Sequence, residues 1–172
     1  DPQVGANPED RCYSCKQNLF RTLKDRAIAD GYPVLLDGTN ASDEAGDRPG
    51  MRALAVLSVR SPLRECGLTK AEIRACSREA GLFTWDKPAY ACLATRVPAG
   101  EAITAETLAR VEGAEDTLFR LGYTDFRVRV FHGATRLQLP RGQMERAVRE
   151  AETIQAALKP YFTPILLDLE GR

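Results

Sequence analysis

The sequence lacks any hydrophobic run long enough to cross a membrane. No stretch of the 172 residues approaches the roughly 18 uninterrupted apolar residues that a membrane span needs. The segment that begins at Asp1 also lacks the basic region and apolar core of a secretory signal peptide. We therefore expect a soluble, cytoplasmic protein that has no membrane partner.

Net charge is absent as well. Lys and Arg together number 24, and so do Asp and Glu, so no overall field draws the chain to nucleic acid or to an anionic surface. The composition, 44% hydrophobic and 28% charged, excludes disorder, coiled coil and collagen. Only five of the 24 cations are Lys, an arginine bias that suits bidentate binding of phosphate or carboxylate but that GC-rich genomes also produce. Nucleic acid is therefore not an expected partner.

Histidine is nearly absent, and the five cysteines are odd in number. Cys12 and Cys15 form a Cys-x-x-Cys, which can bring both sulfurs to one zinc ion, one iron-sulfur cluster or one redox disulfide. A zinc site needs four ligands, but the sequence offers one histidine, His132, and no second Cys-x-x-Cys. Zinc with Cys66 or Cys76 as further ligands is an alternative, although Cys76 falls on the apolar face of an expected helix, where a buried thiol is the ordinary outcome.

A further cysteine lies in a proline-containing segment with no helical or strand periodicity. Cys92 stands between Lys87 and Arg96, whose positive charge would favour the thiolate. The three thiolates of Cys12, Cys15 and Cys92 are one short of a closed 4Fe-4S cluster, which would leave one iron open to hold a substrate or an extra sulfide. The alternative is that Cys92 is a small buried hydrophobic residue.

Hydrophobic patterning predicts an α/β arrangement in the first part of the chain. Apolar spacing predicts a helix over 11–30, and the apolar run at 34–36 predicts a buried parallel strand. The polar turn at 37–40 follows that strand, at the end where open α/β sheets bind ligands. Shorter helices are expected over 50–58 and over 69–80, and a capping box begins the second of these.

The pattern changes at residue 100, where we place a boundary between domains over 1–100 and 101–172. The second part predicts a helix over 104–121, strands over 125–131 and 135–139, a helix over 143–158 and a strand over 165–167. This order is typical of a small α+β lobe with its helices on one face of the sheet.

Two arginines alternate along the first expected strand of this lobe. Arg127 and Arg129 are two residues apart, so both side chains project from the same face of the sheet. Together they could bind one phosphate or carboxylate group. The alternative is a solvated sheet face with no ligand.

Seven short strings, met in order along nearly the whole chain, resemble the LarE family of ATP-dependent sulfur transferases. They are Arg11-Cys-Tyr-Ser-Cys-Lys16, Asp37-Gly-Thr-Asn40, Arg48-Pro-Gly-Met-Arg-Ala53, Ser61-Pro-Leu63, Trp85-Asp-Lys-Pro-Ala89, Cys92-Leu-Ala-Thr-Arg96 and Arg127-Val-Arg129. The resemblance implies the C-terminal part of a PP-loop, adenine nucleotide alpha-hydrolase-like parallel-sheet domain, followed by a small α+β lobe for substrate binding or oligomerisation. It also implies ATP with Mg as co-substrate. The family's Ser-Gly-Gly-x-Asp-Ser loop is absent from the 172 residues, so we expect a missing upstream segment and no activity without it.

By resemblance, the function is a step in making the nickel-pincer nucleotide. Carboxylates on a pyridinium mononucleotide are adenylated by ATP and then converted to thiocarboxylates. Some members of the family give up the sulfur of their own cysteine, which becomes dehydroalanine, and the aligned position here holds Ala91. The sequence resembles instead the branch whose three cysteines, here Cys12, Cys15 and Cys92, hold a 4Fe-4S cluster that carries sulfide.

The resemblance also implies roles for individual residues. Arg127 and Arg129 look like the phosphate-binding pair, and Glu115 looks like an acidic residue near the active site, which with Cys92 would be catalytic. Gln138 stands where the family often has Glu. The nucleotide would lie beside the turn residues Asp37, Thr39 and Asn40. The expected partners are a small nucleotide substrate and further copies of the chain.

Two other functions fit parts of this pattern. A tRNA-thiolating PP-loop enzyme also combines ATP activation with cysteine-bound sulfur, but it should show a basic face, and the net charge of zero argues against one. A metal-stapled interaction module would use the cysteines for folding alone and would have no catalytic activity.

Overall fold

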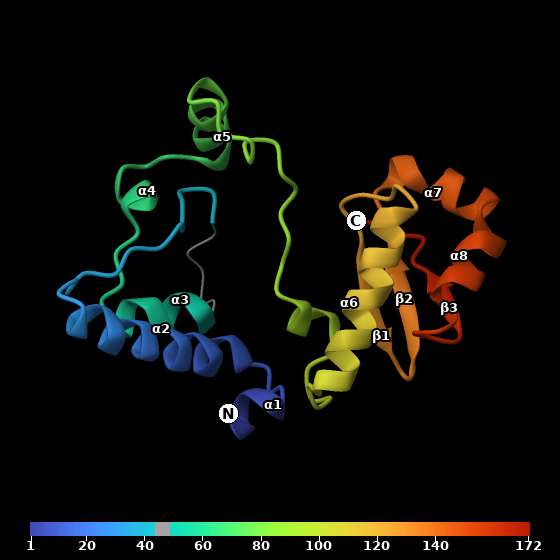
Figure 1. The fold of residues 1–172 in the computed structure, drawn as a ribbon, viewed down its shortest axis with the longest axis horizontal. Helices are drawn as coiled ribbons and strands as arrows, with labels where there is room; N and C mark the ends of the chain where they lie inside the picture. The colour runs from blue at the N-terminus through green and yellow to red at the C-terminus, as the bar shows by residue number, and fades with distance from the viewer. Residues whose placement is uncertain (44–48) are drawn as a thin grey trace. The chain divides into compact units, whose positions relative to one another are not determined.

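The computed structural model describes residues 1–43 and 49–172, and these residues form two compact units (Figure 1). The N-terminal unit comprises Asp1, Gln3 and residues 8–87, and the C-terminal unit comprises Pro2 and residues 4–7 and 88–172. Arg48, which begins one of the seven strings, lies outside the described residues. The division into domains at residue 100 stays a prediction, and residues 88–100 pack with the C-terminal unit.

The described chain is a mixed α/β protein with more helix than strand. Besides the short α1 (Pro2–Gly5), the helices before residue 88 are α2 (Arg11–Ala29), α3 (Pro49–Val56), α4 (Pro62–Glu65) and α5 (Lys70–Glu79). The helices predicted over 11–30, 50–58 and 69–80 are thereby confirmed. None of the helices in the described ranges is both long and apolar enough to span a membrane.

Local sequence signals set both ends of α5. The helices α2 and α3, in contrast, are joined by packing against each other. The Thr69 hydroxyl accepts a hydrogen bond from the Glu72 backbone N–H, and the Glu72 carboxylate accepts one from the Thr69 backbone N–H, which completes the predicted capping box. Beyond the other end of α5, Gly81 has a φ of +70°. α2 packs along α3 (Figure 1).

The predicted buried strand at 34–36 is wrong for the residues described. Leu36 forms a parallel bridge with Arg60, and this is the only strand pairing of the run within the described part of the N-terminal unit. Val34 and Leu36 are 56% and 60% exposed. The expected apolar face of α2 is also partly open, because Leu19 and Ile28 are each 53% exposed. An apolar run is buried only where other elements cover it, and the described residues of this unit do not cover these side chains.

The C-terminal unit is the predicted α+β lobe. Its elements are the 3-10 helix η1 (Leu93–Arg96), α6 (Ala105–Arg120), β1 (Arg127–Phe131), β2 (Ala134–Gln138), α7 (Arg141–Arg149), α8 (Ala151–Leu158) and β3 (Ile165–Leu167). In the described sheet, β2 lies between β1 and β3, antiparallel to β1 and parallel to β3. The hairpin turns at His132 and Gly133, whose φ values of 49° and 81° are typical of a type I′ turn.

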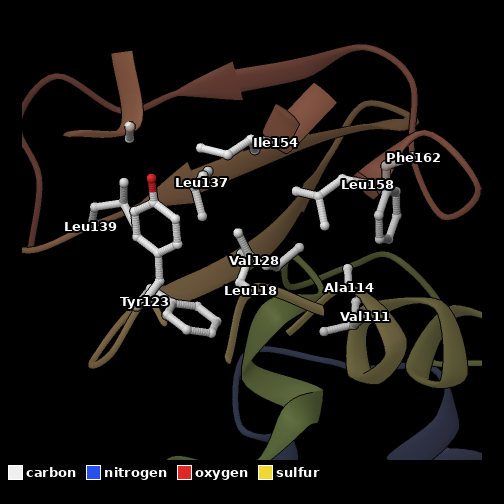
Figure 2. Close-up of a cluster of buried hydrophobic side chains, with 12 residues drawn as sticks. Val111, Ala114, Leu118, Tyr123, Val128, Leu137, Leu139, Ile154, Leu158 and Phe162 are labelled. Carbon is white, nitrogen blue, oxygen red and sulfur yellow. The ribbon is translucent and has the colours of Figure 1, made fainter. Parts of the chain in front are cut away.

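The α-helices α6, α7 and α8 cover one face of the sheet of this unit. Figure 2 shows Val128 and Leu137 of the sheet facing apolar side chains of the helices. Those partners include Val111, Ala114 and Leu118 of α6 and Ile154 and Leu158 of α8. Since side chains alternate along a strand, Arg127 and Arg129 project from the other face of β1.

The predicted helix over 143–158 is two helices, and this prediction of one helix is wrong. Glu150 separates α7 from α8, with φ −95° and ψ 18°. Its carboxylate accepts hydrogen bonds from the Tyr123 hydroxyl at 2.8 Å and from the Arg146 guanidinium at 2.9 Å. The bond from Tyr123 is a tertiary contact, which helical periodicity does not contain, and it holds the residue at which the helix is interrupted.

Candidate functional site

The predicted turn at 37–40 is organised around the carboxylate of Asp37. This carboxylate accepts hydrogen bonds from the Ser61 hydroxyl at 2.6 Å and from the Thr39 hydroxyl, also at 2.6 Å. The Asp37 backbone N–H donates to the Arg60 carbonyl at 2.9 Å. Two of the seven strings, 37–40 and 61–63, are therefore joined in the structure, a contact that their separation in the sequence did not reveal.

These hydrogen bonds favour the ionised form of Asp37. Burial alone would raise the pKa of this carboxyl, but the hydrogen bonds from Ser61 and Thr39, with a smaller contribution from the charge of Lys16, hold the pKa below its ordinary value. Asn40 lies on the same turn, where its backbone N–H donates to the Asp43 carboxylate at 2.9 Å. The three residues predicted to lie beside a nucleotide are thus placed on one ordered turn.

A cavity of about 480 Å³ separates this turn from α2 and α3 in the N-terminal unit. It is lined by Cys12, Lys16, Gly38, Thr39, Asp43, Pro49, Gly50 and Met51. Cys12 and Lys16 are four residues apart on α2 and so share one face of the helix. Lys16 had no predicted role. Its side chain packs against Gly50, since a Cβ added to Gly50 would lie only 3.1 Å from Lys16 Cδ.

All five thiols are free in the structure. Cys12 is exposed, Cys15 is half-buried, and both lie in the first turns of α2, three residues apart on one helix face. Cys92 is exposed at the N-cap of η1, so the alternative of a small buried hydrophobic residue is wrong for it. Cys76 is exposed too, and the expectation of a buried thiol there is also wrong.

The chemistry of three of these thiols suits the binding of an iron-sulfur cluster. Iron-sulfur clusters use soft thiolate ligands, and Cys12, Cys15 and Cys92 each carry a thiol that forms no disulfide, with Cys12 and Cys92 exposed. Cys12 and Cys15 belong to the N-terminal unit and Cys92 to the C-terminal unit, so the ligand set stays a prediction. Within each unit, the described residues bring together no group of three His, Cys, Asp or Glu side chains that could hold a metal ion.

In the C-terminal unit, Glu115 is the centre of a buried hydrogen-bond network. The side chain is fully buried, and it accepts a bidentate pair of bonds from Arg96, at 2.6 Å and 3.2 Å. The Tyr90 hydroxyl donates to Glu115 Oε2 at 2.7 Å, and the Val128 backbone N–H donates to Oε1 at 3.0 Å. Because these donors lie on separate segments, Glu115 links residues 89–96, here called the Cys92 segment, to β1. Its predicted catalytic role stays a prediction.

Arg127 and Arg129 hold the same segment from the sheet. Arg127 donates from Nη2 to the Ala89 carbonyl at 2.7 Å and from Nη1 to the Phe126 carbonyl at 2.6 Å. Arg129 donates from Nη1 to the Thr95 carbonyl at 2.8 Å and from Nε to the Gln138 side chain. The structure thus brings Glu115, Arg127, Arg129 and the Cys92 segment together within one unit.

The charges around this network are predominantly positive. Burial, and then the neighbouring charge of Arg96, lower the pKa of Arg127 and of Arg129 below the ordinary value of arginine. Glu115 offsets part of this charge, since it is paired with Arg96. Arrays of guanidinium groups in a partly dehydrated site bind phosphate and carboxylate groups. Neither Arg96 nor Tyr90 was predicted as a site residue, because their contacts with Glu115 join residues far apart in the sequence.

Comparison with known proteins shows relatives along nearly the whole chain. No family model matches it. The chain is 44% identical over 174 residues to an uncharacterized protein of Synechocystis sp., covering 99% of this chain and 65% of that protein. It is 31% identical over 172 residues to the pyridinium-3,5-bisthiocarboxylic acid mononucleotide synthase of Lactiplantibacillus plantarum, covering 99% of this chain and 62% of the synthase.

A third relative is an uncharacterized protein of Methanocaldococcus jannaschii, 29% identical over 165 residues, which covers 95% of this chain and 64% of that protein. The chain therefore spans less than two thirds of the length of the curated relatives it matches. The similarity establishes a distant relationship to the synthase, which is an enzyme.

Proposed function

We propose that this chain belongs to an ATP-dependent sulfur transferase of the LarE type, which converts adenylated carboxylates of a pyridinium mononucleotide to thiocarboxylates in nickel-pincer nucleotide biosynthesis. The observation that carries the proposal is the 31% identity to the mononucleotide synthase over 99% of the chain. The accessible thiols and the arginine array support it, since a sulfur transfer needs a sulfur-bearing group and a mononucleotide substrate needs an anion site.

The proposed reaction has two steps, adenylation of the carboxylate and then attack by sulfide. A substrate carboxylate oxygen attacks the α-phosphorus of Mg-bound ATP, and pyrophosphate leaves to give an acyl adenylate. The sulfur of a sulfide then attacks the acyl carbon, and AMP leaves with the electron pair of the broken carbon–oxygen bond. A 4Fe-4S cluster held by the thiolates of Cys12, Cys15 and Cys92 would supply that sulfide.

The residues of the chain have separate tasks in this proposal. Arg127 and Arg129 bind the phosphate of the mononucleotide, because their guanidinium groups form a positive array beside the Cys92 segment. Glu115 accepts hydrogen bonds from Tyr90 and Arg96 of that segment and so holds the segment in place. The turn that Asp37 organises borders the nucleotide. Thr39 of this turn lines the cavity that is also lined by residues of α2 and α3.

An iron determination after anaerobic purification tests the sulfur-bearing group. Serine in place of any one proposed ligand should abolish iron binding, because three thiolates already leave one iron without a protein ligand. The variants are Cys12→Ser, Cys15→Ser and Cys92→Ser, and the matched controls are Cys66→Ser and Cys76→Ser. Loss of iron in the control variants, with iron retained in the other three, would show that the ligand set is wrong.

Sulfur transfer itself is tested with the full-length protein, which carries the expected upstream segment, and with a carboxylated pyridinium mononucleotide, ATP, Mg²⁺ and sulfide. The product should gain the mass difference between sulfur and oxygen at each converted carboxylate, and AMP and pyrophosphate should appear in equal amounts. Transfer of sulfur to tRNA instead, with the mononucleotide unchanged, would favour the tRNA-thiolating alternative. An iron-free preparation that unfolds and never transfers sulfur would favour the metal-stapled interaction module.

A further inference from the structure

A second cavity, of about 290 Å³, lies within the C-terminal unit between η1 and the β1–β2 hairpin. Its charged lining residues are Arg96, Arg129, Arg136 and Glu101, and His132 lies at its hairpin side. Arg96 is neutralised by its ion pair with Glu115. The cavity therefore presents the guanidinium groups of Arg129 and Arg136 as positive charges, neither of which forms an ion pair with Glu115.

Arg129 and Arg136 face each other directly across the sheet. The antiparallel register of β1 and β2 pairs Arg129 with Arg136, so their side chains project from the same face. Like charges directly opposite each other on neighbouring strands destabilise a sheet. After burial and the charge of Arg96, the charge of Arg136 is the next contribution that lowers the pKa of Arg129. A bound anion would remove this repulsion.

Both guanidinium groups also have donors left over. Arg136 Nε is buried and has no hydrogen-bond partner among the described residues. The Asp168 carboxylate lies 3.5 Å from it, which makes an ion pair but not a hydrogen bond, and the same oxygen already accepts a bond from Gln138 at 2.8 Å. Arg129 donates from Nε and Nη1, and its Nη2 makes no hydrogen bond within the described residues.

We propose that Arg129 and Arg136 together bind a phosphate group in this cavity. A phosphate monoester carries close to two negative charges and three acceptor oxygens, which matches two facing guanidinium groups better than the single charge of a carboxylate does. This adds Arg136 to the anion-binding residues. That the phosphate is the mononucleotide's own rests on the proposed function, whereas the binding of phosphate by the two arginines does not.

Titration of the ¹⁵N-labelled 172-residue chain with inorganic phosphate, followed by NMR at low ionic strength, tests the proposal. Glutamine removes the charge and keeps a polar side chain, so Arg129→Gln and Arg136→Gln should each weaken binding by at least roughly tenfold. Asp168→Asn should tighten binding, because it removes the carboxylate that faces Arg136. Arg149→Gln is the matched control and should bind as the wild type does, since Arg149 is exposed and paired with Glu145.

Unchanged phosphate affinity in Arg136→Gln, with dispersed spectra showing that the variant is folded, would overturn the proposal. Acetate that binds as tightly as phosphate at the same amide signals would also overturn it, because the site would then be one for carboxylates. Phosphate binding that follows the prediction, together with a full-length protein that transfers no sulfur to the mononucleotide, would leave this site standing and would refute only the proposed function.

Discussion

Removing the hydroxyl of Tyr90 isolates what one hydrogen bond to the buried Glu115 contributes to stability. The Tyr90 hydroxyl donates to a carboxylate that is fully buried, and Tyr90→Phe deletes this donor while it keeps the ring beside Arg96. A hydrogen bond to a charged group contributes about 1.5 to 3 kcal/mol. Because Tyr90 itself is 52% exposed, water replaces part of the lost bond, so we expect the lower end of that range.

Native-state hydrogen exchange measures this loss within the C-terminal unit alone. The slowest core amides, such as those of Val111 and Leu118, should report a free energy of unfolding that is lower by about 1.5 kcal/mol in Tyr90→Phe. The matched control is Tyr123→Phe, which deletes a bond of 2.8 Å to Glu150, a carboxylate open to water. The control should lose less, since its acceptor can be rehydrated.

Alkaline titration adds a second check on the same bond. Burial and the hydrogen bond to Glu115 raise the pKa of Tyr90 to about 12, above its ordinary value of 10.0. A raised folded-state pKa means that the stabilisation is complete below pH 10 and is lost as the pH rises towards 12. The stability difference between wild type and Tyr90→Phe should therefore shrink over that interval. Equal losses in the two Phe variants, or no loss in Tyr90→Phe, would refute the reasoning.

Further predictions follow from the proposed reaction and from the turn at 37–40. Intact-protein mass spectrometry after turnover should show Cys92 unchanged, whereas a sacrificial donor would become dehydroalanine and about 34 Da lighter. Replacing either Arg127 or Arg129 with Ala should weaken binding of the mononucleotide by roughly tenfold to a hundredfold, and calorimetry that finds wild-type affinity in the double variant would exclude them as its ligands. Ser61→Ala should raise the pKa of Asp37 in an NMR titration, because it removes a hydroxyl that donates to the ionised carboxylate. An unchanged pKa would show that this bond does not form in solution.

Features that depend on neighbouring residues in the sequence were predictable. The capping box of Thr69 and Glu72 and the cap of α6 by Thr104 involve residues three apart, so the sequence contains both partners of each bond. The hairpin follows in the same way, because the alternating segments are joined by a turn of two residues, His132 and Gly133, with positive φ.

Features that depend on distant residues were not predictable. The interruption at Glu150 involves Tyr123, and no helical pattern contains that contact. The apolar run at 34–36 has the composition of a buried strand, but its burial depends on elements that cover it, which composition does not specify. In the candidate site, Arg96 reaches Glu115 from another segment, so only the fold shows that they form a pair.

The hydrogen bonds around the Cys92 segment have an entropic consequence. On one side of Cys92 the Ala89 carbonyl and the Tyr90 hydroxyl are held by Arg127 and Glu115, and on the other the Thr95 carbonyl is held by Arg129. Fixing the backbone of one residue costs about 1 to 2 kcal/mol of conformational free energy. In this segment folding has already met that cost, so a group that binds to the exposed thiol of Cys92 does not have to order the chain that carries it.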